Sequence, residues 1–185
     1  LKSNSRLPSS LYGDLNGQVS ALNLGTQRLT DLLKEYGKEK IVSALADLRR
    51  SAAKLMKSYI RDLPNGTYSA EDWLDNDGIS DKPLRISLDI VITDDQMTLD
   101  FSKTSAACDG PVNISRSTCI ASCYVALKHI FREVPANAGV LEPIEFVIPN
   151  DSLLSVRRPK PVGGYTETIL RVIDVMFQAI SQVAP

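Results

Sequence analysis

A strict alternation of apolar and polar side chains between residues 84 and 102 constrains the fold more than any other feature of the sequence. Such alternation is typical of strands that bury one face. The apolar members are Leu84, Ile86, Leu88, Ile90 and Ile92, followed by Met97, Leu99 and Phe101. A two-residue turn at Asp94-Asp95 pairs Ile92 with Met97, Ile90 with Leu99 and Leu88 with Phe101 on that face. We therefore predict a β-hairpin over 84–102, with its register fixed by the pattern.

Two long amphipathic helices are predicted before this hairpin. Apolar residues recur at helical spacing over 14–36 and again over 38–63. Gly37 separates the two stretches, and Pro64-Asn65-Gly66 ends the second. Neither helix can cover its apolar stripe alone, so we predict an antiparallel pair that packs together and on something else. This helical pair forms the predicted first domain, residues 1–66.

The second predicted domain, residues 67–185, is a small α/β part. A helix over 116–132 is apolar around most of its circumference, which indicates burial on several sides. A short strand is expected over 144–148, between two prolines, and a last amphipathic helix over 166–183. The predicted fold class is α+β: an antiparallel pair of long helices plus an α/β part with a β-hairpin and two packed helices.

The composition excludes some classes of partner. The 185 residues include 21 basic and 22 acidic ones, a formal net charge of -1, so nothing in the charge favours nucleic acid or an anionic membrane. No apolar run approaches the length of a membrane span. Three cysteines are an odd number for a disulfide framework, and residues 1–6 have no apolar leader. We therefore expect a cytoplasmic protein.

The nucleophiles and metal-ligand types do not converge on a recognisable catalytic centre. Cys119 and Cys123 share a helix face, but His129 lies about 120° around the helix from Cys123. Small apolar thiols are common in cores, so packing is favoured over a zinc site. A catalytic triad would have to use His129, which we expect to face solvent. We therefore assign no catalytic and no metal-binding residue.

An acidic cluster at residues 71–77, followed by Gly78, invites comparison with a calcium loop. In an EF-hand, the glycine at the sixth position would place Trp73 at the first position and Leu84 at the twelfth, where ligands are required. Both fail. We predict a solvated acidic turn, with Ser69 capping a short helix.

The sequence Gly163-Gly164-Tyr165-Thr166-Glu167-Thr168 precedes the last predicted helix and has two readings. Free N–H groups and two glycines suit the binding of an anion or a carbonyl oxygen. Alternatively, the glycines permit a tight entry into the helix, with Thr166 as its cap and Glu167 complementing the dipole. The residues alone favour the second reading.

Seven segments in order along the chain together resemble the hydantoinase B / oxoprolinase family. They are 13–23, 33–37, Asp72-Trp73-Leu74-Asp75 with Asp77-Gly78, Leu99-Asp100-Phe101-Ser102, Gly110-Pro111-Val112-Asn113, Pro135-Ala136-Asn137-Ala138-Gly139, and 162–168 running into 171–175. The family includes B-type subunits of N-methylhydantoinases, the C-terminal half of 5-oxoprolinase, and subunits of acetone and acetophenone carboxylases.

The resemblance implies a fragment of the B-type subunit of an ATP-dependent cyclic-amide hydrolase, inactive alone. Alternatives are a fragment of a related ketone carboxylase subunit, or a non-catalytic subunit-interaction module. The parent complex would use ATP with Mg and a divalent metal, whose His and Asp motifs lie upstream of the matched region. The implied partners are a hydantoinase A-type subunit or domain and a small cyclic amide or ketone, in an oligomer. No cofactor is expected within this chain.

Two loops are the candidate substrate-facing segments, 109–113 and 163–167. Both precede predicted helices, where backbone donors and short polar side chains can hold a substrate oxygen. The residues that we assign to this role are Asp109, Asn113, Gly163, Gly164, Thr166 and Glu167.

Overall fold

The computed structural model describes residues 2–183 and confirms the α+β class. The elements are α1 (Pro8–Tyr36), α2 (Lys38–Arg61), β1 (Gly66–Leu74), β2 (Leu84–Thr93), β3 (Gln96–Asp100), α3 (Arg116–Ile130), β4 (Ile144–Val147) and α4 (Tyr165–Ile180), with 3-10 turns at Lys2–Asn4 and Ala138–Leu141. Two compact units divide within α2, between Asp47 and Leu48. The division predicted at residue 66 concerns folding domains and stays a prediction.

The four strands form one sheet in the order β1-β2-β3-β4. β2 and β3 are the predicted hairpin, and the register is confirmed, with Ile92 opposite Met97 and Ile90 opposite Leu99. This ladder ends at Asp100, one step before the predicted partner of Leu88. Phe101 instead donates its N–H to the carbonyl of Val147 (2.8 Å), at the end of the parallel pair between β3 and β4.

Residues 71–74 of the acidic cluster belong to the edge strand β1, and residues 75–77 follow it in a loop, so the predicted short helix capped by Ser69 is wrong. β1 pairs with β2 along its whole length, from Gly66 opposite Ile92 to Leu74 opposite Leu84. Ser69 donates its hydroxyl to Asp89 on β2 (2.7 Å) rather than capping a helix. Strand pairing satisfies the backbone groups that a solvated turn would expose to water.

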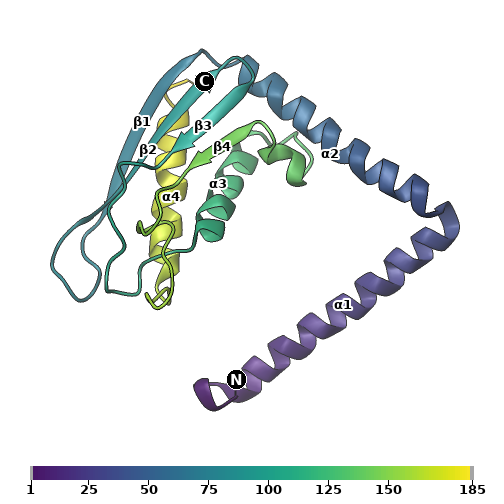
Figure 1. Cartoon of the computed structure of the whole chain (residues 1–185), viewed down its shortest axis with the longest axis horizontal. Coiled ribbons are helices and arrows are strands. Elements are labelled where there is room, and N and C mark those ends of the chain that lie inside the picture. Colours follow the sequence, from purple (N-terminus) through teal and green to yellow (C-terminus); the bar gives the residue numbers. More distant parts are fainter. Residues whose placement is uncertain (1, 184–185) are drawn as a thin grey trace. The chain divides into compact units, whose positions relative to one another are not determined.

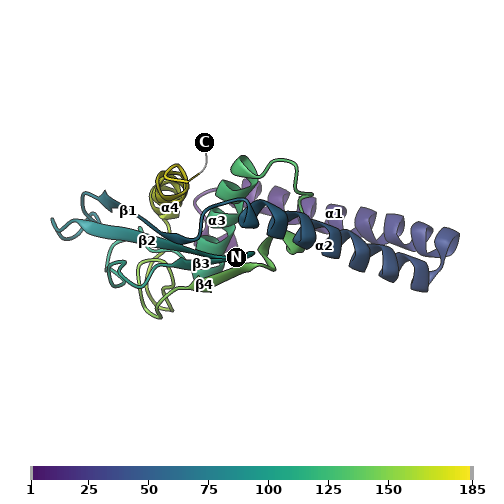
Figure 2. The same cartoon turned by 90° about the horizontal axis from the view of Figure 1, so that it is seen from above.

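Two helices cover one face of this sheet. Figure 1 shows α3 and α4 behind the strands, and Figure 2, turned by 90°, places both on the same side. Ser115 caps α3 by accepting the N–H of Thr118 (3.2 Å). The core between sheet and helices includes Ile86, Leu88, Ile90, Met97 and Leu99 from the strands and Cys123, Leu127, Val172, Met176 and Ala179 from the helices, all fully buried. The predicted α/β part is therefore a single packed layer of helices on a sheet.

The second half of α2 belongs to this core. Ala52, Ala53, Met56 and Ile60 are buried. The 3-10 turn at Ala138–Leu141 approaches α2 so closely that a Cβ on Gly139 would lie 2.1 Å from the carbonyl oxygen of Arg49. Asn137 donates to the carbonyl of Leu48 (3.3 Å), one residue past the division between the units. The helix is thus anchored by backbone contact as well as by apolar packing.

The first unit is built differently. α1 buries none of its side chains, although its apolar residues recur as predicted, and Leu22 is 71% exposed. The helix begins at Pro8, six residues before the predicted start, because proline suits the first turn of a helix. Gly37 ends it with a positive φ of 80°, as its position predicted. The expected covering of the stripe is not found within the described residues up to Asp47.

Candidate functional site

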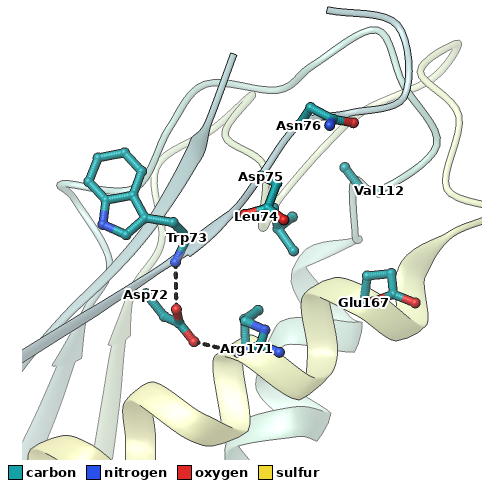
Figure 3. Close-up of a pocket in the computed structure, with 8 residues that line it drawn as sticks. All are labelled: Asp72, Trp73, Leu74, Asp75, Asn76, Val112, Glu167 and Arg171. Atoms are coloured by element: carbon teal, nitrogen blue, oxygen red, sulfur yellow. Dashed lines mark hydrogen bonds and ion pairs between the residues drawn. The ribbon is translucent and has the colours of Figure 1, made fainter. Parts of the chain in front are cut away.

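A polar groove of about 520 Å³ lies where β1 ends and α4 begins (Figure 3). Its lining residues are Asp72, Trp73, Leu74, Asp75, Asn76, Val112, Glu167 and Arg171. Glu167 and Arg171 stand one helical turn apart on α4, so both side chains reach the same side. The groove thus combines three segments that are far apart in the sequence.

An ion pair between a strand and a helix forms one wall. Arg171 donates to Asp72 Oδ2 (2.9 Å), and the N–H of Trp73 donates to the other oxygen (2.8 Å), as Figure 3 shows. Burial alone would raise the pKa of Asp72, but the hydrogen bonds from Arg171 and Trp73 outweigh it and leave that pKa lowered. The same pair raises the pKa of Arg171. Both groups therefore stay charged at neutral pH.

The structure brings the two predicted loops together. Gly164 donates its N–H to the carbonyl of Pro111 (2.9 Å), and Thr168 donates its hydroxyl to the carbonyl of Val112. Lys160 and Asp109 form an ion pair between the same two segments. Residues 109–113 and 160–168 are thus one joined structure beside the groove.

The six predicted site residues occupy different positions in this structure. Glu167 lines the groove, whereas Asn113 is 0% exposed and its side-chain amide forms hydrogen bonds with backbone groups. Asp109 and Gly163 are exposed. The helix cap is Gly164, so the reading of Thr166 as the cap is wrong, because α4 already begins at Tyr165 and leaves Thr166 exposed within the first turn. A substrate-facing role for the six stays a prediction.

Sequence reasoning missed the four other groove residues with polar or charged side chains: Asp72, Asp75, Asn76 and Arg171. Asp72 falls at an inward position of β1, where its partner comes from 99 residues further along the chain. The only signal for Asp72, Asp75 and Arg171 was their place in segments 72–75 and 171–175 of the family resemblance, and Asn76 lies outside both segments. A local pattern cannot show that Asp72 and Arg171 pair.

The other candidate metal ligands, two cysteines and one histidine, lie on α3. Cys119 and Cys123 are buried in the core, as predicted. His129 is exposed, as expected, and its Nδ1 donates to the carbonyl of Val125 (2.8 Å). Among residues 2–183, no three His, Cys, Asp or Glu side chains are grouped to hold a metal ion. Over the same range, no helix combines the length and apolar character that crossing a bilayer needs.

Known proteins share both the sequence and the fold. The chain is 30% identical over 197 residues to a protein of Pseudomonas sp. strain NS671 described as the B-type subunit of a D-/L-hydantoinase, with 100% of this chain and 33% of that protein covered. The crystal structure of an ATP-dependent caprolactamase from Pseudomonas jessenii matches 100% of the chain and 32% of its own, with a TM-score of 0.88 and 25% identity.

A nucleotide-free acetone carboxylase shares the fold over 84% of the chain and 22% of its own, with a TM-score of 0.70 and 16% identity. The chain spans about a third of the length of its hydantoinase and caprolactamase relatives, and 14% of the length of a 5-oxoprolinase of Arabidopsis thaliana to which it is 25% identical. The family model for Hydantoinase B/oxoprolinase matches residues 1–185, the whole of the chain. The chain therefore belongs to the hydantoinase B/oxoprolinase family.

Proposed function

We propose that this chain is part of the B-type subunit of a cytoplasmic, ATP-dependent hydrolase of cyclic amides. The observation that carries the proposal is the match of its whole length to an ATP-dependent caprolactamase, with a TM-score of 0.88. Caprolactam is a cyclic amide, and the related D-/L-hydantoinase protein points to the same class of ring.

The chemistry of the groove supports a substrate that carries an N–H. The carboxyl groups of Asp75 and Glu167 offer acceptors and the Asn76 amide offers an Nδ2 donor, whereas the one guanidinium, Arg171, is already bonded to Asp72 and lies 3.5 Å from Asp174. A cyclic amide presents an N–H donor beside its carbonyl, whereas a simple ketone presents only an acceptor. In this proposal the groove binds and orients the ring, and the joined loops 109–113 and 160–168 hold its carbonyl side.

The chemical step itself is assigned to parts of the enzyme beyond this chain. Among the described residues, no three His, Cys, Asp or Glu side chains are grouped as a bound divalent metal would require. We propose that a hydantoinase A-type partner handles ATP with Mg, and that metal ligands stand upstream in the parent protein. The chain alone is then inactive.

Two other functions each have one observation in their favour. The acetone carboxylase fold favours a subunit of a ketone carboxylase. The exposed apolar stripe of α1 favours a role in subunit interaction, with Leu22, Val19 and Leu29 among its exposed members. The second role is compatible with the proposed one, because a scaffold part of an enzyme has no activity of its own.

A substrate panel tests the choice. The full-length subunit, purified with its A-type partner, is assayed for ATP hydrolysis with hydantoin, 5-oxoproline and caprolactam, and with acetone and acetophenone plus bicarbonate. We expect ATP hydrolysis and ring opening with at least one cyclic amide. Turnover of the ketones alone would overturn the proposal in favour of the carboxylase. This chain alone serves as the inactive reference.

Two variants of the full-length enzyme test the site. Glu167→Gln removes the negative acceptor at the groove, and Asn113→Ala releases the loop beside it. We expect each to lower kcat/KM by about 10-fold or more, because displaced substrate groups lose their reactive alignment. Glu133→Gln, an exposed acid just after α3, is the matched control and should stay at the wild-type value. Wild-type kinetics in both site variants would count against the groove.

A further inference from the structure

Buried polar side chains tie together the three segments that carry the groove. Asp77, on the loop after β1, is only 5% exposed. Its Oδ1 accepts the N–H groups of Ile79 (2.9 Å) and Ser80 (2.7 Å) within its own loop. Its Oδ2 accepts the N–H of Gly110 (3.1 Å), 33 residues away. One carboxylate therefore fixes the shape of its own loop and the position of the next.

Asn113 makes the second tie. Its Oδ1 accepts the N–H of Cys108 (2.9 Å), and its Nδ2 donates to the carbonyls of Gly110 (2.9 Å), Cys108 (3.1 Å) and Pro161 (3.0 Å). The last of these bonds crosses 48 residues, to the segment that leads into α4. The side chain is fully buried, so none of this bonding is exchanged with water.

The loops that contain Asp77 and Gly110 pack so closely that there is no room for a side chain at position 110. A Cβ built on Gly110 would lie 1.8 Å from the carbonyl oxygen of Asp77, so only glycine allows this approach. We call Asp77, Gly110 and Asn113 the clasp. An apolar contact between the loops would tolerate sliding, whereas buried hydrogen bonds are directional and costly to leave unmade. The clasp therefore fixes the position and orientation of the two loops relative to each other, and not only the distance between them.

In each of the three segments, a residue that lines the groove directly precedes a residue whose side chain forms one of these hydrogen bonds. Asn76 precedes Asp77, and Val112 precedes Asn113. On α4, Glu167 precedes Thr168, whose hydroxyl donates to the carbonyl of Val112. The positions of three lining residues from three segments thus depend on the same bonded set.

We propose that Asp77 and Asn113 are positioning residues that set the width of the groove and the placement of Glu167 within it. The inference rests on the proposed function, in that the groove receives the substrate. This role requires no contact between either side chain and the substrate, because Asn113 has no exposed surface and Asp77 turns both oxygens to backbone N–H groups.

A double-mutant cycle in the full-length enzyme with its partner subunit tests this role. Asp77→Asn keeps the size of the side chain but turns an NH2 toward the N–H of Gly110, so the tie between the loops is lost. We expect kcat/KM for the cyclic amide to fall between about 10-fold and 100-fold, mainly through KM. Asp81→Asn, an exposed acid four residues along the same loop, is the matched control and should remain within two-fold, roughly the scatter of such assays.

The decisive measurement is the combination of Asp77→Asn with Glu167→Gln. If the clasp acts by placing Glu167, the double variant should be no slower than the slower single variant. Losses that multiply would overturn the proposal, because a general loss of stability is independent of Glu167. Asn113→Ala should give the same pattern and guards against a folding defect that is particular to position 77.

Hydrogen exchange separates failure of this inference from failure of the proposed function. If the wild-type complex turns over no cyclic amide, the proposed function fails, and the inference about substrate placement fails with it. If Glu167→Gln and Asp77→Asn are both as active as wild type while amides of 109–113 exchange faster in Asp77→Asn only, the clasp orders loops without serving the substrate, and the inference alone is overturned. Unchanged exchange at 109–113 in Asp77→Asn would overturn the clasp itself.

Discussion

The two units of this chain use apolar residues in opposite ways. In the second unit, apolar side chains at alternating strand positions and on three helices meet in one core, and many are fully buried. In the first unit, apolar residues recur just as regularly along α1, yet the described part of that unit buries no side chain. Periodicity therefore predicts the element and its apolar face, but it does not reveal whether the same chain supplies the cover.

The largest expected effect comes from removing a core side chain of the second unit. Phe101, the residue after β3, is 0% exposed. We expect Phe101→Ala to lower the free energy of unfolding by about 3–5 kcal/mol, from lost apolar burial and the cavity left behind. Urea unfolding, followed by the fluorescence of Trp73, reports on this unit because the chain has no other tryptophan.

Leu22→Ala in α1 is the matched control from the exposed stripe. It should change the free energy of unfolding by less than about 0.5 kcal/mol, as surface substitutions do. A loss as large as that of Phe101→Ala would break the comparison, since it would mean that Leu22 is buried in solution by contacts that the structure lacks.

The next largest loss in the free energy of unfolding is expected from a substitution at Gly139. Gly139→Ala would place a Cβ against backbone atoms of α2, the carbonyl oxygen of Arg49 (2.1 Å) and the nitrogen of Ala53 (2.9 Å). We expect a loss of about 1–3 kcal/mol, because neither helix nor turn can move without disturbing the core. Thermal unfolding measured by circular dichroism checks this. An unchanged Tm would show that the turn at Ala138–Leu141 is not held against α2.

How far the sequence predicts the fold depends on whether the deciding contacts are local. The hairpin register follows from residues 84–102 alone, so it was predicted correctly as far as Asp100. β1 was missed because Asp72 stands at an inward position, where the pattern reads as polar until Arg171 is known to pair with it. Likewise, the helix start led to the prediction of Glu167 as a site residue, but the groove that Glu167 lines could not be predicted, since its walls meet only in the folded chain.

Acid should weaken the second unit through its paired aspartates. Lys103 (2.7 Å) and the hydroxyl of Ser69 (2.7 Å) hold the pKa of Asp89 below its usual range, although burial acts in the opposite direction. A lowered folded-state pKa contributes stability above the unfolded value of about 3.9, and that contribution is lost as the pH falls through the folded-state pKa. We expect Asp89→Asn to lose about 1 kcal/mol at pH 7 and to depend less on pH below about 4. The urea midpoints of wild type and Asp89→Asn, measured from pH 2 to 7, give the loss of stability and its pH dependence. If Asp89→Asn depends on pH as the wild type does, other carboxylates cause the acid sensitivity.

The smallest effect should have the opposite sign and fall in the first unit. A Cβ added at Gly17, within α1, meets no atom within 4 Å, in contrast to Gly139. Glycine costs a helix interior about 0.8–1 kcal/mol relative to alanine, so Gly17→Ala should stabilise α1 locally by up to that amount. Amide exchange in α1 should slow, while the Trp73 unfolding transition of the second unit stays unchanged. Faster exchange in Gly17→Ala within the full-length complex would mean that another surface lies against the Gly17 side of α1 there.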